Sequence, residues 1–127
     1  MTDLAQGAHD IEIEVPLRTE RAGTVRVVAA SLAADAGFTI DEIDDLRLAI
    51  SEVFSMLVEA SPGGRARVVF DVSGDQVAAT IGHVNSAAAI DIDELGATIL
   101  TAVVDDYSVE GNSIRVVKTG RESNSTA

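Results

Sequence analysis

The sequence predicts an α+β fold, a two-layer sandwich in which a mixed, mostly antiparallel sheet carries helices on one face. Some segments alternate polar and apolar residues, and others repeat apolar residues at helical spacing. These segments follow one another as strand, helix, helix, strand, strand, helix, strand, strand, an order typical of a two-layer sandwich. The 127 residues, 46% of them hydrophobic, suit one domain with its own core.

The first strand is expected over residues 10–17, where apolar and acidic side chains alternate. Pro16 near its end favours an edge strand or a strand terminus. Thr19 is a candidate cap for the first helix, and Gly37 is its expected stop. The apolar stripe of this helix comprises Val25, Val28, Ala29, Leu32 and Ala36.

The second helix is expected to begin at Thr39, which with Glu42 three residues later matches a capping box. The run Ser61-Pro62-Gly63-Gly64 ends it. Its apolar stripe comprises Ile43, Leu46, Ile50, Val53 and Leu57.

Two alternating segments, residues 66–72 and 77–81, are joined at Ser73-Gly74-Asp75 and predict a hairpin. Residues 83–92 have no clear period and are expected to form a loop. A third helix is indicated by Leu95, Ile99, Ala102 and Val103, and a last hairpin turns at residues 110–112. Residues 1–9 and 120–127 are expected to be disordered, which leaves a domain of residues 10–119.

Composition excludes several classes of site. Without cysteine there are no disulfides or thiolate metal sites, and two histidines do not suffice for a multi-histidine site. The net charge of −12 disfavours nucleic acid; it either serves solubility or steers the domain toward a basic protein partner. We find no signal peptide and no apolar run of about 20 residues, so we expect no membrane contact and a cytoplasmic location.

The segment Asp45–Val53, DLRLAISEV, resembles the one that opens the ATP site in bacterial anti-sigma-factor serine-protein kinases. These belong to the histidine-kinase-like (GHKL) ATPase superfamily, whose ATP-binding fold is of the Bergerat type. Weaker similarity lies in Leu95–Leu100, in Val103–Tyr107, which matches the end of the family's closing helix, and in Gly111–Lys118, which matches its final strand. The resemblance covers roughly residues 10–119 and agrees with the order of elements.

The resemblance implies that Glu52 occupies the position of the general base, which activates the acceptor hydroxyl or a water. An asparagine four residues later binds magnesium in the family, and this spacing places both on one helix face. Here that position is Met56. A thioether is a poor ligand for magnesium, which demands oxygen, so we expect no metal site.

Two further departures follow the predicted hairpin. The family's Asp-x-Gly-x-Gly, which reads adenine, is replaced by His83-Val84-Asn85-Ser86-Ala87. The family's flexible lid is shortened to Val84–Asp93. Of the phosphate-binding glycine pair only Gly96 remains, because Glu94 stands at the first position, where its carboxylate would repel phosphates.

These losses predict that ATP and magnesium are not cofactors. Each charge-assisted contact is worth about 1.5–3 kcal/mol, so losing three or four removes a micromolar affinity of about 8 kcal/mol. Glu52 is then either a relic general base or an ordinary solvated residue, and Gly96 is a relic of the phosphate loop. Met56 is expected to fill core or pocket space, and His83 to be a satisfied strand-end histidine.

The resemblance implies a regulator of transcription that binds a sigma factor or the antagonist of an anti-sigma factor. Occupying a surface that the sigma factor needs for polymerase requires no phosphoryl transfer. The family dimerises through its first-strand region, and the alternation over residues 10–17 permits a homodimer. Two alternatives stay open. One is an ATP-dependent serine protein kinase that phosphorylates the antagonist, and the other is a scaffolding domain that kept only the fold.

Overall fold

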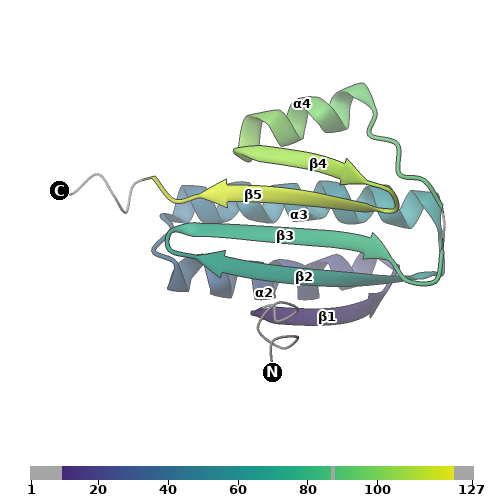
Figure 1. Cartoon of the computed structure of the whole chain (residues 1–127), viewed down its shortest axis with the longest axis horizontal. Coiled ribbons are helices and arrows are strands. Elements are labelled where there is room, and N and C mark those ends of the chain that lie inside the picture. The colour runs from purple at the N-terminus through teal and green to yellow at the C-terminus, as the bar shows by residue number, and fades with distance from the viewer. Residues whose placement is uncertain (1–9, 87, 122–127) are drawn as a thin grey trace, which may run out of the picture.

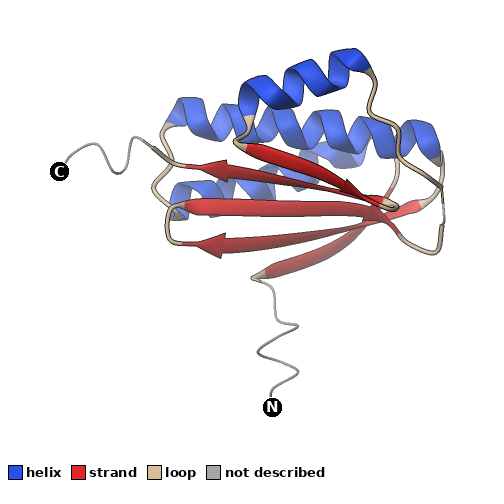
Figure 2. Ribbon diagram, turned by 45° about the horizontal axis from the view of Figure 1, so that its top comes forward, coloured by secondary structure: helices blue, strands red, loops and turns tan. Residues whose placement is uncertain are grey.

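The computed structural model describes residues 10–86 and 88–121 (Figure 1). Three α-helices cover one face of a five-stranded sheet whose order is β1-β2-β3-β5-β4 (Figure 2). Every paired strand runs antiparallel to its neighbour, so the two-layer architecture is confirmed and the described sheet is wholly antiparallel. The elements are β1 (Ile11–Pro16), a 3-10 turn η1 (Thr19–Arg21), α2 (Ala22–Asp35), α3 (Ile40–Ala60), β2 (Arg65–Ser73), β3 (Gln76–His83), α4 (Glu94–Val103), β4 (Asp106–Glu110) and β5 (Ser113–Thr119).

The core lies between the sheet and the helices. Side chains alternate across the sheet, so Val68, Phe70 and their partners Ile81 and Ala79 on β3 share the face that the helices cover. All four are fully buried. Each large apolar side chain buried in this way contributes about 1.5–3 kcal/mol, which binds the two layers together.

The first helix ends as predicted but begins differently. Thr19 is not its cap: it starts the 3-10 turn η1, and α2 begins at Ala22 without a side-chain cap bond. At the other end Gly37 has a φ of 86°, and its N–H donates to Ala34 O at 3.1 Å. The N–H of the following Phe38 donates to Ala33 O at 3.0 Å, which completes a Schellman motif.

The capping box of α3 is confirmed. Thr39 Oγ1 accepts from the Glu42 N–H at 3.2 Å, and Glu42 Oε1 accepts from the Thr39 N–H at 2.8 Å. Of the predicted apolar stripe only Ile43 is partly exposed; the others are fully buried. Since α3 contacts α2, α4, β3 and β5, this helix holds the centre of the helical layer.

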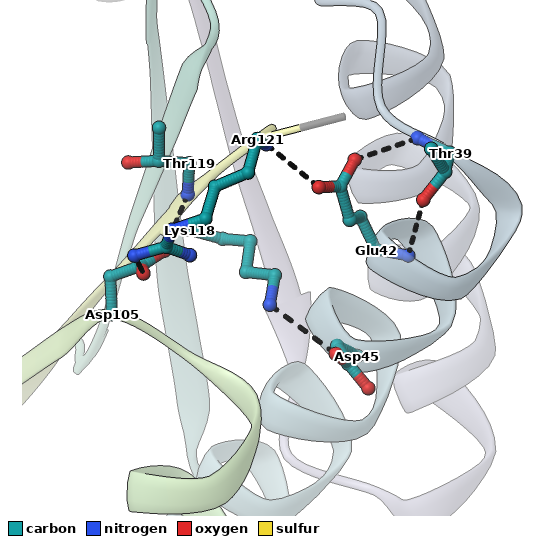
Figure 3. A network of polar contacts seen from close by, with 7 residues as sticks. All are labelled: Thr39, Glu42, Asp45, Asp105, Lys118, Thr119 and Arg121. Carbon is teal, nitrogen blue, oxygen red and sulfur yellow. Dashed lines mark hydrogen bonds and ion pairs between the residues drawn. The ribbon is translucent and has the colours of Figure 1, made fainter. Parts of the chain in front are cut away.

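The end of β5 is tied to the start of α3 by a polar network (Figure 3). Lys118 is buried, and its Nζ lies 3.3 Å from Asp45 Oδ2. The backbone N–H of Arg121 donates to Glu42 Oε2 at 2.7 Å. Glu42, a member of the capping box of α3, thus also binds the last described residue of the chain. The carboxylate of Asp45 thus compensates the charge of a buried lysine, which would otherwise be costly.

Asp105 anchors the same strand. Its Oδ2 accepts from the Thr119 N–H at 2.7 Å, and its carboxylate pairs with Arg121. Burial alone would raise the pKa of Asp105, but these hydrogen bonds and the charges of Arg121 and Lys118 outweigh burial and lower it.

The expected disordered tail begins two residues too early. Gly120 is buried and its N–H donates to Asp75 O at 2.8 Å, and Arg121 is held as described above. The other expectations of disorder, for residues 1–9 and 122–127, lie outside the described residues. None of the described helices is long and apolar enough to cross a membrane.

The third helix buries a different side from the one that its apolar residues predicted. Its buried residues are Gly96, Leu100 and Val103, whereas Leu95 is 68% exposed and Ala102 is exposed. Gly96 has no side chain and so allows a close approach to α3, and the apolar pattern alone did not reveal this contact.

We expect Thr39→Ala to destabilise the fold by about 1 kcal/mol, because the N–H of Glu42 loses its acceptor. Urea unfolding measures the change. Thr19→Ala is the matched control, since no side-chain bond of Thr19 caps a helix. Equal losses in the two variants would contradict the assignment of the cap.

Candidate functional site

The residues that correspond to the nucleotide site lie where α3 meets the start of α4. Met56 is one turn after Glu52 on α3, and both side chains are half-buried. The methyl group of Met56 lies 2.6 Å from the point where a Cβ on residue 96 would stand. Met56 therefore covers Gly96 directly, as expected of a residue that fills pocket space.

The amide of Gly96 is already hydrogen-bonded. Asp93 is the N-cap of α4, and its Oδ1 accepts from the Gly96 N–H at 2.7 Å. Glu94 adds a second negative charge in the first turn. Free amides at a helix N-terminus attract anions. At the start of α4 the anions are two carboxylates of the chain itself, Asp93 and Glu94. Asp93 is not among the predicted site residues, although an aspartate just before a predicted helix is a cap signal.

A cavity of about 360 Å³ beside this contact is acidic. Its polar lining is made of carboxylates and contains no lysine or arginine; the residues are Met56, Glu59, Ala60, Ala89, Asp91 and Asp93. Across residues 10–86 and 88–121 no group of three or more potential ligands could hold a metal ion. The thioether of Met56 is a poor ligand for magnesium, and carboxylates without a nearby cation repel the phosphates of a nucleotide.

His83 stands at the end of β3, where the family reads adenine. Its side chain is only 7% exposed, and neither ring nitrogen has a partner within the described chain. The expectation of a satisfied histidine is therefore wrong for the imidazole, although the backbone N–H donates to Asn112 O at 3.1 Å. Burial lowers the pKa of His83, so the ring is neutral at pH 7.

Glu52 has no hydrogen bond or ion pair to any described residue. The structure thus brings Met56 and Gly96 together but gives the relic base no group that would orient it. Arg47, nearby on α3, pairs with Asp44: its Nη1 lies 3.4 Å from Asp44 Oδ1. Both of these side chains are about half exposed, so the pair adds little stability.

A second hollow, which the sequence did not reveal, lies between α2 and α3. Arg26 Nη1 donates to Ser51 Oγ at 3.0 Å, and no carboxylate among the described residues pairs with this arginine. Val27, beside Arg26, is 69% exposed, and Leu48, one turn before Ser51, is 44% exposed. The hollow has a volume of about 220 Å³ and is lined by Thr19, Ala22, Arg26, Ser51, Phe54, Ser55 and Val58. We name it the α2–α3 groove.

Comparison with known proteins finds relatives over most of the chain. It is 27% identical over 124 residues to the serine-protein kinase RsbW of Bacillus subtilis (strain 168), covering 91% of this chain and 76% of that protein. It is 29% identical over 108 residues to the anti-sigma-F factor RsbW of Mycobacterium tuberculosis (strain CDC 1551 / Oshkosh), covering 80% of this chain and 61% of that protein. No family model matches.

One solved structure shares the fold. The crystal structure of the RsbU and RsbW domains of Rv1364c from Mycobacterium tuberculosis aligns with a TM-score of 0.59 at 21% identity. The alignment covers 87% of this chain but 32% of that one, so this chain spans about a third of the longer protein. At this identity the likeness concerns the fold alone.

We expect stability to fall as the pH drops below about 6.5, the ordinary pKa of histidine, because the unfolded chain then binds a proton that buried His83 resists. Asp105 affects stability only at lower pH. Because folding lowers its pKa, its contribution to the free energy of unfolding is lost only when the pH falls below about 3.8, the ordinary pKa of aspartate. Urea unfolding between about pH 7.5 and 5 isolates the histidine contribution.

His83→Leu should flatten this dependence and add about 1 kcal/mol at pH 7, because a buried unpaired polar group is removed. His9→Leu, which removes the only other histidine, is the control. A pH dependence that survives in His83→Leu would contradict the assignment.

Proposed function

We propose that this chain is a member of the anti-sigma-factor and serine-protein kinase family of histidine-kinase-like ATPases, and that it regulates transcription by binding another protein without using ATP. Its partner is a sigma factor or the antagonist of an anti-sigma factor. It acts by occupying a surface that the sigma factor needs for polymerase, in the cytoplasm where transcription takes place.

The observation that carries the proposal is the filled phosphate position at the start of α4. Met56 covers Gly96, and Asp93 occupies its amide. A phosphate entering here would have to displace a bonded carboxylate and approach the charge of Glu94. Since each lost charge-assisted contact costs about 1.5–3 kcal/mol, the nucleotide gains too little to bind.

The α2–α3 groove supports the protein-binding part of the proposal. It places an arginine with no carboxylate partner among the described residues beside the apolar side chains of Phe54 and Val58. Apolar area next to a specific charge suits a protein interface. A partner carboxylate could pair with Arg26 there while aliphatic side chains cover the apolar residues. Such binding needs no catalytic group.

A serine protein kinase is the second candidate. Glu52 and Gly96 are retained at the positions that the family uses, and the Bacillus subtilis relative is named a serine-protein kinase. Met56, His83 and Glu94 oppose it, because each replaces a residue that the chemistry needs.

The proposal includes a homodimer that forms through the first-strand region. β1 is an edge strand, and the sheet face opposite the helices is uncovered by described elements (Figure 2). A second copy could therefore pack through the first-strand region. Light scattering on the purified chain should give twice the mass of 13.2 kDa, and a single-chain mass at micromolar concentration would reject the dimer.

Calorimetric titration with magnesium-ATP and with ADP should show no binding up to about 1 mM nucleotide, because the phosphate position is filled. The Bacillus subtilis RsbW protein serves as the comparison. Micromolar binding, or phosphorylation of an antagonist that Glu52→Ala abolishes, would establish the kinase instead.

Arg26→Glu should weaken binding to the cognate sigma factor or antagonist by about tenfold or more, because a partner carboxylate would face a like charge. Purified candidates from the same genome are measured by biolayer interferometry. Arg47→Glu, an exposed reversal on α3 outside the groove, is the control. If no sigma factor and no antagonist binds the unaltered chain, the proposed function is wrong.

A further inference from the structure

The outward side of α4 is unusual for a helix that faces solvent. Only Glu94 among its ten residues is charged, and Leu95 is 68% exposed. A shallow hollow of about 370 Å³ runs along it, lined apart from Glu94 by Ala97, Thr98, Thr101 and Ala102. A solvent-facing helix normally carries charged residues on this side, and an uncharged side is typical of an interface.

The strand beside this helix ends the sheet. β4 pairs with β5 on one side and with no described strand on the other. Figure 1 shows that β4 runs back alongside α4, so its last residues lie at the end where α4 begins. Val109 there faces the helical layer yet is 44% exposed, because α4 does not cover it. We call the outward side of α4 together with β4 the α4–β4 edge.

The two edges of the sheet differ in charge. On β1, Glu14 pairs with Arg65 and Arg67, and Arg67 also lies 4.0 Å from Glu12. On β4, Asp106 and Glu110 are exposed and form no ion pair with any described residue. The β1 edge is thus largely neutralised internally, whereas the β4 edge strand presents unpaired carboxylates. Asp106 and Glu110 project on the sheet face opposite the helices, and Val109 projects on the helical side of the same strand.

The negative charge of Asp106 and Glu110 limits which kind of surface can bind at the α4–β4 edge. A second copy of the chain placed on the edge would bring Asp106 and Glu110 against like charges, which is unfavourable. A basic surface would be attracted, and surfaces that neutralise DNA phosphates are rich in lysine and arginine. A sigma factor must present such a surface to promoter DNA.

We propose that the α4–β4 edge docks on the basic, DNA-contacting surface of the partner sigma factor and so competes with DNA for it. This inference rests on the proposed function, since it names the surface of that partner. Leu95 and Val109 contact aliphatic parts of the partner, while Asp106 and Glu110 pair with its lysines and arginines. The α2–α3 groove is a separate surface made by other elements.

The test uses the full chain and each purified alternative sigma factor of the same genome. The double variant Asp106→Lys with Glu110→Lys should bind about tenfold more weakly at about 50 mM salt, and the difference should shrink at about 500 mM. Leu95→Ser should weaken binding at both salt concentrations. The control is Asp35→Lys with Glu59→Lys, the same change of charge on α2 and α3. Circular dichroism verifies that every variant is folded.

Competition provides a second readout. Duplex DNA carrying the promoter of that sigma factor should displace the unaltered chain, and a ternary complex of sigma factor, DNA and this chain would overturn the inference. Binding that is lost in Arg26→Glu but unchanged in the β4 double variant would also overturn it and leave the proposed function intact. Failure of every sigma factor to bind the chain would overturn the docking inference outright.

Discussion

The packing of α3 against the sheet is the interaction on which the rest of the molecule depends. Leu46, Ile50, Val53 and Leu57 are all fully buried on one side of this helix. With α3 held in this way, α2 packs along one flank and α4 along the other. The same rotation of the helix turns Met56 toward Gly96, so the contact that fills the phosphate position follows from core packing. Burial of apolar area is the main driving force for this arrangement.

Internal groups have taken over the positions that a nucleotide would use. The carboxylate of Asp93 stands in for a phosphate at the amide of Gly96, and the methyl group of Met56 fills the space above it. Each replacement satisfies a local need, since a helix N-terminus requires an acceptor and a core requires close packing. His83 is different, because its buried ring has no described partner and contributes a cost in place of a contact. The start of α4 is therefore closed by groups of the chain itself.

Some charged side chains pair with one another within the fold, and others are left available to a partner protein. The network of Lys118, Asp45, Arg121 and Asp105 is used within the fold, where it fastens β5 to α3 (Figure 3). Within residues 10–86 and 88–121, Arg26 between α2 and α3 has no partner of opposite charge, and neither do the carboxylates of β4. Under a net charge of −12, a lone arginine in a groove and an acidic edge offer a partner two distinct kinds of contact.

The order of elements, the capping box of Thr39 and the helix end at Gly37 could be predicted from the sequence, because each depends on residues within a few positions of one another. Comparison of sequence patterns also identified Met56 and Glu94 as departures from a nucleotide site. Three features emerged only from the folded chain: Thr19 starts a 3-10 turn, Leu95 faces solvent, and Asp45 meets Lys118. These outcomes depend on contacts between residues far apart in the chain. An apolar or charged residue type does not reveal its partner, and packing between layers selects which side of each element is covered.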